Sequence, residues 1–75
     1  MQQLIEYITR SLVENPDQVH ISSHRSGPNL YIEVTAAPGD VGRLIGRRGR
    51  TAQAIRAVAR VAAARQGLRV TIDID

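Results

Sequence analysis

The first half of the chain changes from a helical to a strand-like spacing of apolar residues. Apolar residues between positions 4 and 12 follow the spacing of one helical face. Asn15-Pro16-Asp17 ends this helix, because proline cannot continue a helix and restricts the residue before it. Residues 19–23 and 30–35 then alternate apolar and polar positions on either side of a turn-rich segment, residues 25–29. The sequence therefore predicts a helix followed by a β-hairpin.

The next segment returns to helical spacing. Pro38-Gly39 breaks the second strand, and Asp40 is well placed to cap a short helix over residues 41–45. After a glycine-containing loop, Thr51 can cap a helix of about 15 residues, and Gly67 is suited to end it. The predicted inner face of this helix consists of Ala52, Ile55, Ala59 and Ala62, with Val58 beside them.

The last predicted element is a strand. Residues 68–74 alternate without interruption, which is the clearest strand signal in the chain. The predicted order is helix, strand, strand, helix, helix, strand. A three-stranded sheet with all helices packed on one face accounts for every apolar stripe, so we predict an α+β fold in a single domain, residues 1–75.

Composition narrows the class of protein. A chain of 75 residues has a modest core, and dimerisation is one way to add to its stability. It has no cysteine, hence neither a disulfide nor a thiolate metal site. The N-terminus lacks a signal-peptide core, and no apolar run approaches the roughly 20 residues that span a bilayer. We expect a soluble cytoplasmic protein without membrane association.

The basic residues gather in one part of the chain. The net charge is only +3, but no Asp or Glu occurs between Asp40 and Asp73. Eight of the ten basic residues lie in that stretch: Arg43, Arg47, Arg48, Arg50, Arg56, Arg60, Arg65 and Arg69. Such asymmetry favours a surface that binds a polyanion over a merely solvated helix.

The centre of the basic stretch is Gly46-Arg47-Arg48-Gly49, between two predicted helices. Glycine lets the backbone adopt positive φ and lets a ligand approach closely. Arginine supplies planar donors suited to phosphate. The helix that follows directs its free N–H groups and the positive end of its dipole to the same place. This combination predicts contact with a sugar-phosphate backbone.

The segment IGRRGRTAQAIR resembles the I-G-x-x-G signature of K-homology (KH) domains. In that family a helix, a GxxG loop and a helix clamp about four nucleotides of single-stranded nucleic acid. The resemblance covers nearly the whole chain and is greatest to the small bacterial single-KH RNA-binding proteins of the KhpA type. It implies the type II arrangement, in which an α-β unit precedes a β-α-α-β core.

The resemblance also implies roles for individual residues. Gly46 and Gly49 would allow the backbone of the nucleic acid to approach, and Arg47 and Arg48 would contact phosphates. Ile45 would contact the bases, although a plain core position fits it equally well.

Other arginines extend the predicted site. Arg43 and Arg50 flank the loop in the sequence, and Arg56 and Arg60 lie four residues apart on one helical face. Arg65 and Arg69 are weaker candidates because they lie far along the chain from the loop.

Two functions follow as hypotheses. The first is non-enzymatic binding of single-stranded RNA, with single-stranded DNA as a possible ligand, in an RNA chaperone or post-transcriptional regulator. The second is a dimerisation or adaptor module, because KhpA-type proteins are associated with self-association and with a larger KH-containing RNA-binding partner. The alanine-rich basic helix that begins near Thr51 is also the candidate dimer surface. A second protein chain would then compete with RNA for the arginines of this helix.

Catalytic and metal sites find little support. His20 and His24 fall in a predicted strand and turn, with no cysteine or nearby acid to complete a metal site. Asp73 and Asp75 share a strand face at the terminus, which indicates a solvated edge. No nucleotide-binding glycine motif occurs. Tyr7 and Tyr31 are the only aromatic residues, so a base-stacking sheet surface is not expected.

Overall fold

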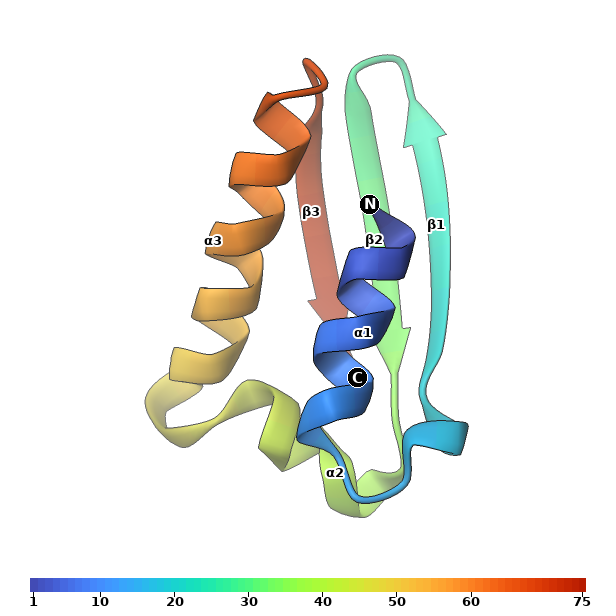
Figure 1. Cartoon of the computed structure of the whole chain (residues 1–75), viewed down its shortest axis with the longest axis vertical. Helices are drawn as coiled ribbons and strands as arrows, with labels where there is room; N and C mark the ends of the chain where they lie inside the picture. The colour runs from blue at the N-terminus through green and yellow to red at the C-terminus, as the bar shows by residue number, and fades with distance from the viewer.

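The chain forms a three-stranded sheet with its helices on one face (Figure 1). The computed structural model describes residues Met1–Asp75. Its elements in chain order are α1 (Gln2–Leu12), the 3₁₀ turn η1 (Pro16–Gln18), β1 (His20–Ser26), β2 (Asn29–Thr35), α2 (Pro38–Ile45), the 3₁₀ turn η2 (Arg47–Gly49), α3 (Arg50–Ala64) and β3 (Arg69–Ile74). The predicted α+β class and the predicted order of helices and strands are confirmed. No helix combines the length and apolar character needed to cross a membrane.

β2 is the central strand of the sheet, whose order is β1-β2-β3. It pairs antiparallel with β1 and parallel with β3. The two-residue turn Gly27-Pro28 joins β1 to β2, and Gly27 has a φ of +60°, as the first residue of a tight hairpin turn requires. The turn is therefore shorter than the predicted segment 25–29. The parallel pair needs a long crossover, which α2, η2 and α3 supply.

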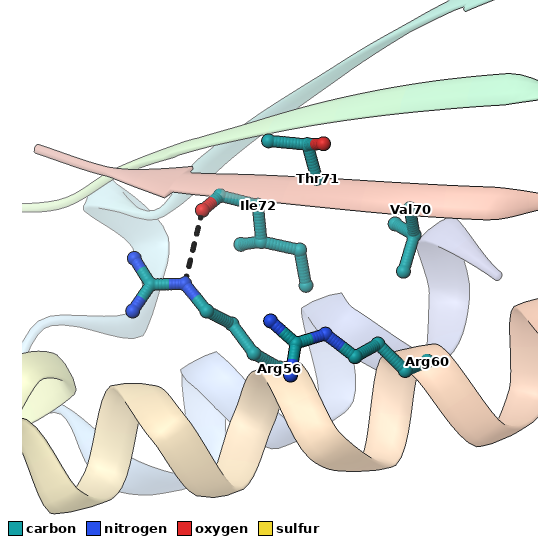
Figure 2. Close-up of a pocket in the computed structure, with 5 residues that line it drawn as sticks. All are labelled: Arg56, Arg60, Val70, Thr71 and Ile72. Carbon is teal, nitrogen blue, oxygen red and sulfur yellow. Dashed lines mark hydrogen bonds between the residues drawn. The ribbon is translucent and has the colours of Figure 1, made fainter.

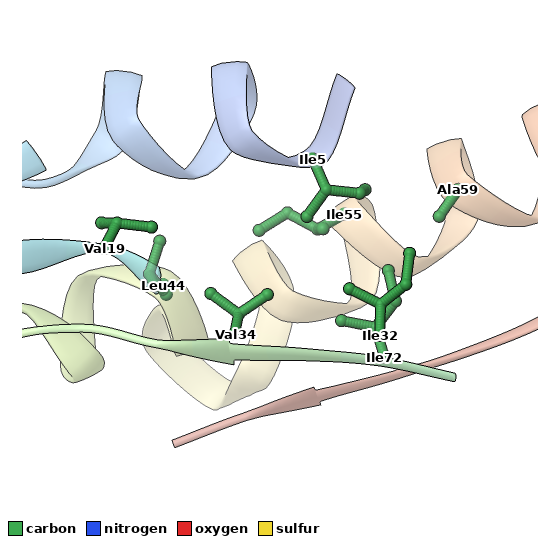
Figure 3. Close-up of a cluster of buried hydrophobic side chains, with 8 residues drawn as sticks. All are labelled: Ile5, Val19, Ile32, Val34, Leu44, Ile55, Ala59 and Ile72. Carbon is green, nitrogen blue, oxygen red and sulfur yellow. The ribbon is translucent and has the colours of Figure 1, made fainter. Parts of the chain in front are cut away.

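The core lies between the sheet and the helices. In the parallel register Ile32 pairs with Ile72 and Val34 with Ile74, and the alternation of a strand puts these side chains on the helix side. Figure 3 shows the buried cluster of Ile5, Val19, Ile32, Val34, Leu44, Ile55, Ala59 and Ile72. The helices α1, α2 and α3 and the strands β2 and β3 all contribute to this cluster, and Ile21 of β1 packs against it, so the position of each helix depends on the same small core.

The inner face of α3 differs in part from the prediction. Ala52, Ile55 and Ala59 are buried as expected, but the fourth buried residue is Ala63, whereas Ala62 is half-buried. Val58, predicted to lie beside this stripe, is 46% exposed. The burial follows spacings of three, four and four residues, which a helix of 3.6 residues per turn allows as readily as the predicted pattern.

Both predicted N-caps are wrong. α2 begins at Pro38, whose fixed φ and missing N–H suit the first position of a helix. Asp40 is therefore already inside the helix, and Ala37 precedes it without a side-chain cap. α3 begins at Arg50 with Gly49 as its N-cap, so Thr51 is also inside its helix.

Asp40 instead ties α2 to the loop after α1. Its side chain is 2% exposed. Oδ1 accepts the backbone N–H of Glu14 at 3.1 Å, and Oδ2 accepts the backbone N–H of Asn15 at 3.0 Å and its side-chain amide at 3.2 Å. Nε of Arg43 lies 3.4 Å from Oδ1, and a second guanidinium nitrogen pairs with the carboxylate of Glu14. One carboxylate thus satisfies the free backbone donors of Glu14 and Asn15 in the loop after α1.

The environment of Asp40 lowers its pKa. Burial by itself would raise the pKa, but the two backbone N–H donors, the Asn15 amide and the Arg43 guanidinium outweigh burial and bring it below the ordinary value of 3.8. A lowered pKa in the folded state means that the ionised form stabilises the fold. This contribution is complete above the unfolded pKa and is lost as the pH falls through the folded pKa.

We predict that Asp40→Asn lowers the melting temperature at pH 7 and makes the melting temperature less sensitive to a fall in pH. Asparagine keeps one acceptor oxygen, so at least one of the three donors now facing Asp40 is left without a partner. Thermal melts by circular dichroism between pH 7 and pH 3 measure both effects. The wild type should lose more stability than the variant as the pH falls below about 4.

Asp17→Asn is the matched control, because Asp17 is exposed in η1 and makes no ion pair. It should leave the melting temperature at pH 7 nearly unchanged. Equal acid profiles for wild type and Asp40→Asn would contradict the role assigned to this carboxylate.

Candidate nucleic-acid interface

The GRRG loop, residues 46–49, reverses the chain between α2 and α3 by a run of unusual backbone angles. Gly46 has φ of +76° and ψ of 172°, Arg48 has φ of +59° and ψ of 26°, and Gly49 has φ of +72° and ψ of 14°. The N–H of Gly46 donates to the carbonyl of Gly42 at 2.8 Å, and that of Gly49 to the carbonyl of Gly46 at 3.1 Å. The loop is thus a defined turn held by backbone hydrogen bonds.

Gly46 is required by both its conformation and its neighbours. Its combination of φ and ψ is essentially restricted to glycine. A Cβ at this position would lie 2.2 Å from Oγ1 of Thr51 and 2.8 Å from the backbone nitrogen of Thr51. The start of α3 therefore packs directly on the backbone of Gly46, which fixes the angle at which α2 and α3 meet.

Gly49 has a different role. A Cβ there would contact nothing within 4 Å, so only its left-handed φ favours glycine. The empty space lies at the N-terminus of α3, and it leaves the backbone of the loop accessible to a ligand.

Arg48 is the one non-glycine residue with a positive φ. This conformation costs roughly 1 kcal/mol for a side chain with a Cβ. The helices on both sides impose it, and its presence in a loop that carries free charge is typical of functional sites.

The arginines differ in whether the protein already binds them. Arg43 is paired with Glu14 and Asp40, so this predicted site residue supports the junction of α1 and α2 and is not a free cation. The side chains of Arg47, Arg48 and Arg50 are exposed and make no hydrogen bond or ion pair within the chain. The loop and the first residue of α3 therefore present three unneutralised guanidinium groups.

A groove runs between α3 and the free edge of β3. This edge groove is lined by Arg56, Arg60, Val70, Thr71 and Ile72 and encloses about 120 Å³. In Figure 2 the side chains of Val70 and Ile72 point toward α3 and that of Thr71 points away from it. Nε of Arg56 donates to the carbonyl of Ile72 at 3.3 Å. Arg56, a predicted site residue, thus lies in the groove with part of its guanidinium engaged.

The exposed edge of β3 carries backbone groups as well. The N–H groups of Arg69 and Asp75 donate to Pro28 and Val34 of the central segment. In a parallel pair alternate residues bond to the same neighbour, so Val70 and Ile72 direct their N–H and C=O groups to the open edge. The carbonyl of Ile72 already accepts Nε of Arg56, and the remaining groups can hydrogen-bond to the edges of bases that lie in the groove. No sequence pattern indicates this feature, because it depends on β3 lying at the edge of the sheet.

Ile45 lies at the end of α2, just before the loop, and is 39% exposed. Ile45 is not a member of the buried cluster, and its side chain is only partly exposed to solvent. This partial exposure differs from a plain core position, and the contact of Ile45 with bases stays a prediction.

The outer face of the sheet has the opposite charge. His24 stacks on Tyr31 with ring centroids 6.3 Å apart. The parallel register pairs Glu33 with Asp73, and carboxylate oxygens of Glu33, Asp73 and Asp75 lie within 4.8 Å of one another. All three acids are exposed, and their negative charge disfavours phosphate on this face.

Comparison with known proteins places the chain in a family. The family model described as "KhpA/KhpB, KH domain" matches residues 2–74. The chain belongs to this KH-domain family. The family is non-enzymatic, so the prediction that the chain is not an enzyme agrees with its membership.

Similar proteins come from several bacteria. The chain is 46% identical over 74 residues to the RNA-binding protein KhpA of Halalkalibacterium halodurans, covering 99% of this chain and 97% of the relative. It is 42% identical to that of Clostridium acetobutylicum, covering 99% of each. It is 37% identical to that of Streptomyces coelicolor, covering 100% of this chain and 95% of the relative. The predicted resemblance to the bacterial KhpA type is confirmed.

We predict that Gly46→Ala destabilises the fold by at least about 2 kcal/mol, because it adds backbone strain to a steric conflict with α3. Gly42→Ala is the control: it lies in α2, and its Cβ would meet nothing within 4 Å. That substitution should stabilise the protein by about 0.5–1 kcal/mol. Urea denaturation measures both changes. A Gly46→Ala protein as stable as the wild type would show that the contact with Thr51 is easily relieved.

Proposed function

We propose that this chain binds single-stranded RNA, with the phosphate backbone over the GRRG loop and the bases in the edge groove. The observation that carries the proposal is the set of three unpaired arginine side chains, Arg47 and Arg48 in the loop and Arg50 at the start of α3, beside the open space at Gly49. Family membership supports RNA in preference to other polyanions, since the relatives above are named RNA-binding proteins. Single-stranded DNA is the natural competitor to test beside it.

Charge supports a particular path for the strand. Arg56 and Arg60 line the helix wall of the edge groove, whereas Glu33 and Asp73 occupy the outer face of the sheet. Phosphates are therefore attracted to the helix wall and repelled from the outer face. Bases would then point to the open edge of β3, where backbone N–H and C=O groups are available.

This arrangement predicts a short footprint with little sequence selectivity. A GxxG loop holds about four nucleotides, and aliphatic side chains such as Ile45 and Val70 accept any base. Low selectivity suits an RNA chaperone or a post-transcriptional regulator. We infer that residues 1–75 act as one domain in the cytoplasm, where such RNA is found.

We predict that charge reversal, Arg47→Asp with Arg48→Asp, reduces RNA affinity by more than about 100-fold, because two charge-assisted contacts become repulsive. The milder pair Arg47→Gln with Arg48→Gln should flatten the log–log salt slope from about −3 to about −1.5, since roughly two of four phosphate contacts are lost. Fluorescence anisotropy with a labelled oligoribonucleotide measures both. The melting temperature should change little, because these side chains are exposed and unpaired.

A control variant with the same net charge distinguishes binding by the loop from general electrostatic attraction of RNA. Arg10→Gln with Arg25→Gln also takes the net charge from +3 to +1. Arg10 pairs with Glu6 and Arg25 bonds to the hairpin turn, both away from the loop. If the two glutamine pairs weaken binding equally, only overall charge matters and the proposed site is wrong.

A second function is favoured by an exposed apolar surface on the helices. This apolar helix face comprises Leu4, Tyr7, Leu12, Val58 and Val61, which are 37–74% exposed. Between α1 and α3 it includes a hollow of about 360 Å³ lined mostly by apolar residues. A stable interface buries about 800 Å² on each partner, about a sixth of the 4952 Å² surface of this chain. We propose that this face forms a two-fold homodimer.

The same face would suit a related KH domain. A heterodimer with a larger KH-containing RNA-binding protein would bury the same apolar residues. Joining two RNA-binding domains raises the effective concentration of the second site, so dimerisation would strengthen binding beyond that of one short footprint.

We predict that Val61→Asp converts a dimer of twice 8.2 kDa into a monomer at micromolar concentration, because burying an unpaired carboxylate in an apolar interface is costly. Light scattering coupled to gel filtration measures the mass. Tyr31→Asp, an equally drastic change on the outer face of the sheet, should leave the mass of the dimer unchanged. A wild-type protein that is monomeric at all concentrations tested would exclude the homodimer.

A further inference from the structure

We propose a second phosphate-binding site at the far end of the edge groove, where Arg60 and Arg69 hold RNA beyond the nucleotides on the GRRG loop. This site rests on the proposed function, because it extends the same RNA strand. The loop motif contains neither arginine, and no sequence pattern indicates that Arg60 and Arg69 lie at one site.

The structure brings these two arginines to one place. Arg60, Leu68, Arg69 and Val70 line a hollow of about 280 Å³, which we call the distal hollow. Arg60 and Val70 also line the edge groove, so the two depressions adjoin each other. A strand leaving the edge groove away from the loop therefore enters the distal hollow.

The turn between α3 and β3 fixes the distal hollow. The N–H of Leu68 donates to the carbonyl of Ala63 at 2.9 Å, which closes the end of α3. The N–H of Arg69 donates to the carbonyl of Pro28 at 2.8 Å, which attaches the start of β3 to the hairpin. Arg69 is thus placed by backbone hydrogen bonds, although it is nine residues from Arg60 in the chain.

Strand alternation puts Arg69 on the outer side of β3, in register with Asn29. Arg69 thus belongs to the outer face of the sheet, but β3 is an edge strand, so its side chain reaches around the open edge and lines the distal hollow together with Arg60. The two arginines therefore stand on either side of the same open edge, one on the helix wall and one on the strand.

The charges in the distal hollow favour a phosphate. Arg60 and Arg69 are exposed, and the side chain of neither makes a hydrogen bond or ion pair within the chain, unlike that of Arg56. No acid lines the hollow. The acids of β3, Asp73 and Asp75, lie at the opposite end of the strand. Leu68 and Val70 add an apolar floor on which a sugar or a base can rest.

The separation of the two sites sets the length of RNA needed. Arg60 is ten residues beyond Arg50 on α3, or about 15 Å along the helix. Stacked nucleotides advance about 3.4 Å each, so this distance corresponds to roughly four nucleotides. A tetranucleotide would occupy the loop alone, whereas an octanucleotide would reach both sites.

The test compares degenerate RNA tetramers and octamers by fluorescence anisotropy over a range of salt. An octamer gains about fivefold on any four-nucleotide site, because it offers more registers. The distal site adds at least about tenfold to this gain in the wild type and makes the log–log salt slope steeper, from about −3 to about −4. Arg60→Gln with Arg69→Gln should lower the ratio of octamer to tetramer affinity to about fivefold. The tetramer affinity of the same variant is the reference, because Arg60 also lines the edge groove.

Arg25→Gln with Arg65→Gln is the matched control, with the same net charge of +1 and with both residues outside the two hollows. It should retain the octamer gain. Tetramer binding with no octamer gain beyond fivefold overturns the distal site and leaves the loop site standing. Equal loss in both glutamine pairs assigns the gain to overall charge and also overturns the distal site. Failure of the wild type to bind either RNA overturns the proposed function as well.

Discussion

The parallel pairing of β2 with β3 is the constraint on which the other features depend. Two parallel strands cannot be joined by a short turn, so the chain must cross the face of the sheet and return. α2, the GRRG loop and α3 form that crossover. The same pairing leaves β3 at an edge, with its backbone groups open beside α3. The loop and the edge groove are thus consequences of one topological requirement.

The packing of α2 against α3 converts this crossover into a defined site. Because Thr51 lies where a side chain of Gly46 would be, the two helices meet at a fixed angle and the loop turns sharply. That turn forces Arg48 into a left-handed conformation and ends at Gly49, where the surface is open. Asp40 supports the other end of α2 by binding the loop after α1. Both ends of the short helix are therefore held by contacts outside it.

Much of the fold could be predicted from residue spacing, because each apolar stripe matches one buried face. The β3 pattern and the core positions Ile32, Val34 and Ile72 follow from alternation alone. The errors have local causes. Aspartate is a favourable N-cap residue, but Pro38 starts α2 before Asp40 is reached. The carboxylate of Asp40 instead accepts the backbone N–H groups of the loop after α1, which is remote in the sequence.

The candidate site was predictable only in its local part. GRRG is contiguous in sequence, so its glycines and arginines could be found by motif. The engagement of Arg43 by Glu14 could not, because those residues are 29 positions apart. The same holds for the meeting of Arg60 with Arg69 across the α3–β3 turn. Which charged side chains meet in space depends on the tertiary structure, and the spacing of residues along the chain does not reveal it.

The structure also places the two proposed functions on different sides of α3. On α3, successive residues are about 100° apart, so Arg60 and Val58 lie about 160° from each other around the helix. The arginine flank lines the edge groove, and the valine flank belongs to the apolar helix face beside α1. RNA and a second protein chain would then occupy opposite sides of α3 without competing. Arg50 is the exception: it adjoins the loop and also lines the apolar hollow. Any coupling between RNA binding and assembly would therefore pass through the first turn of α3.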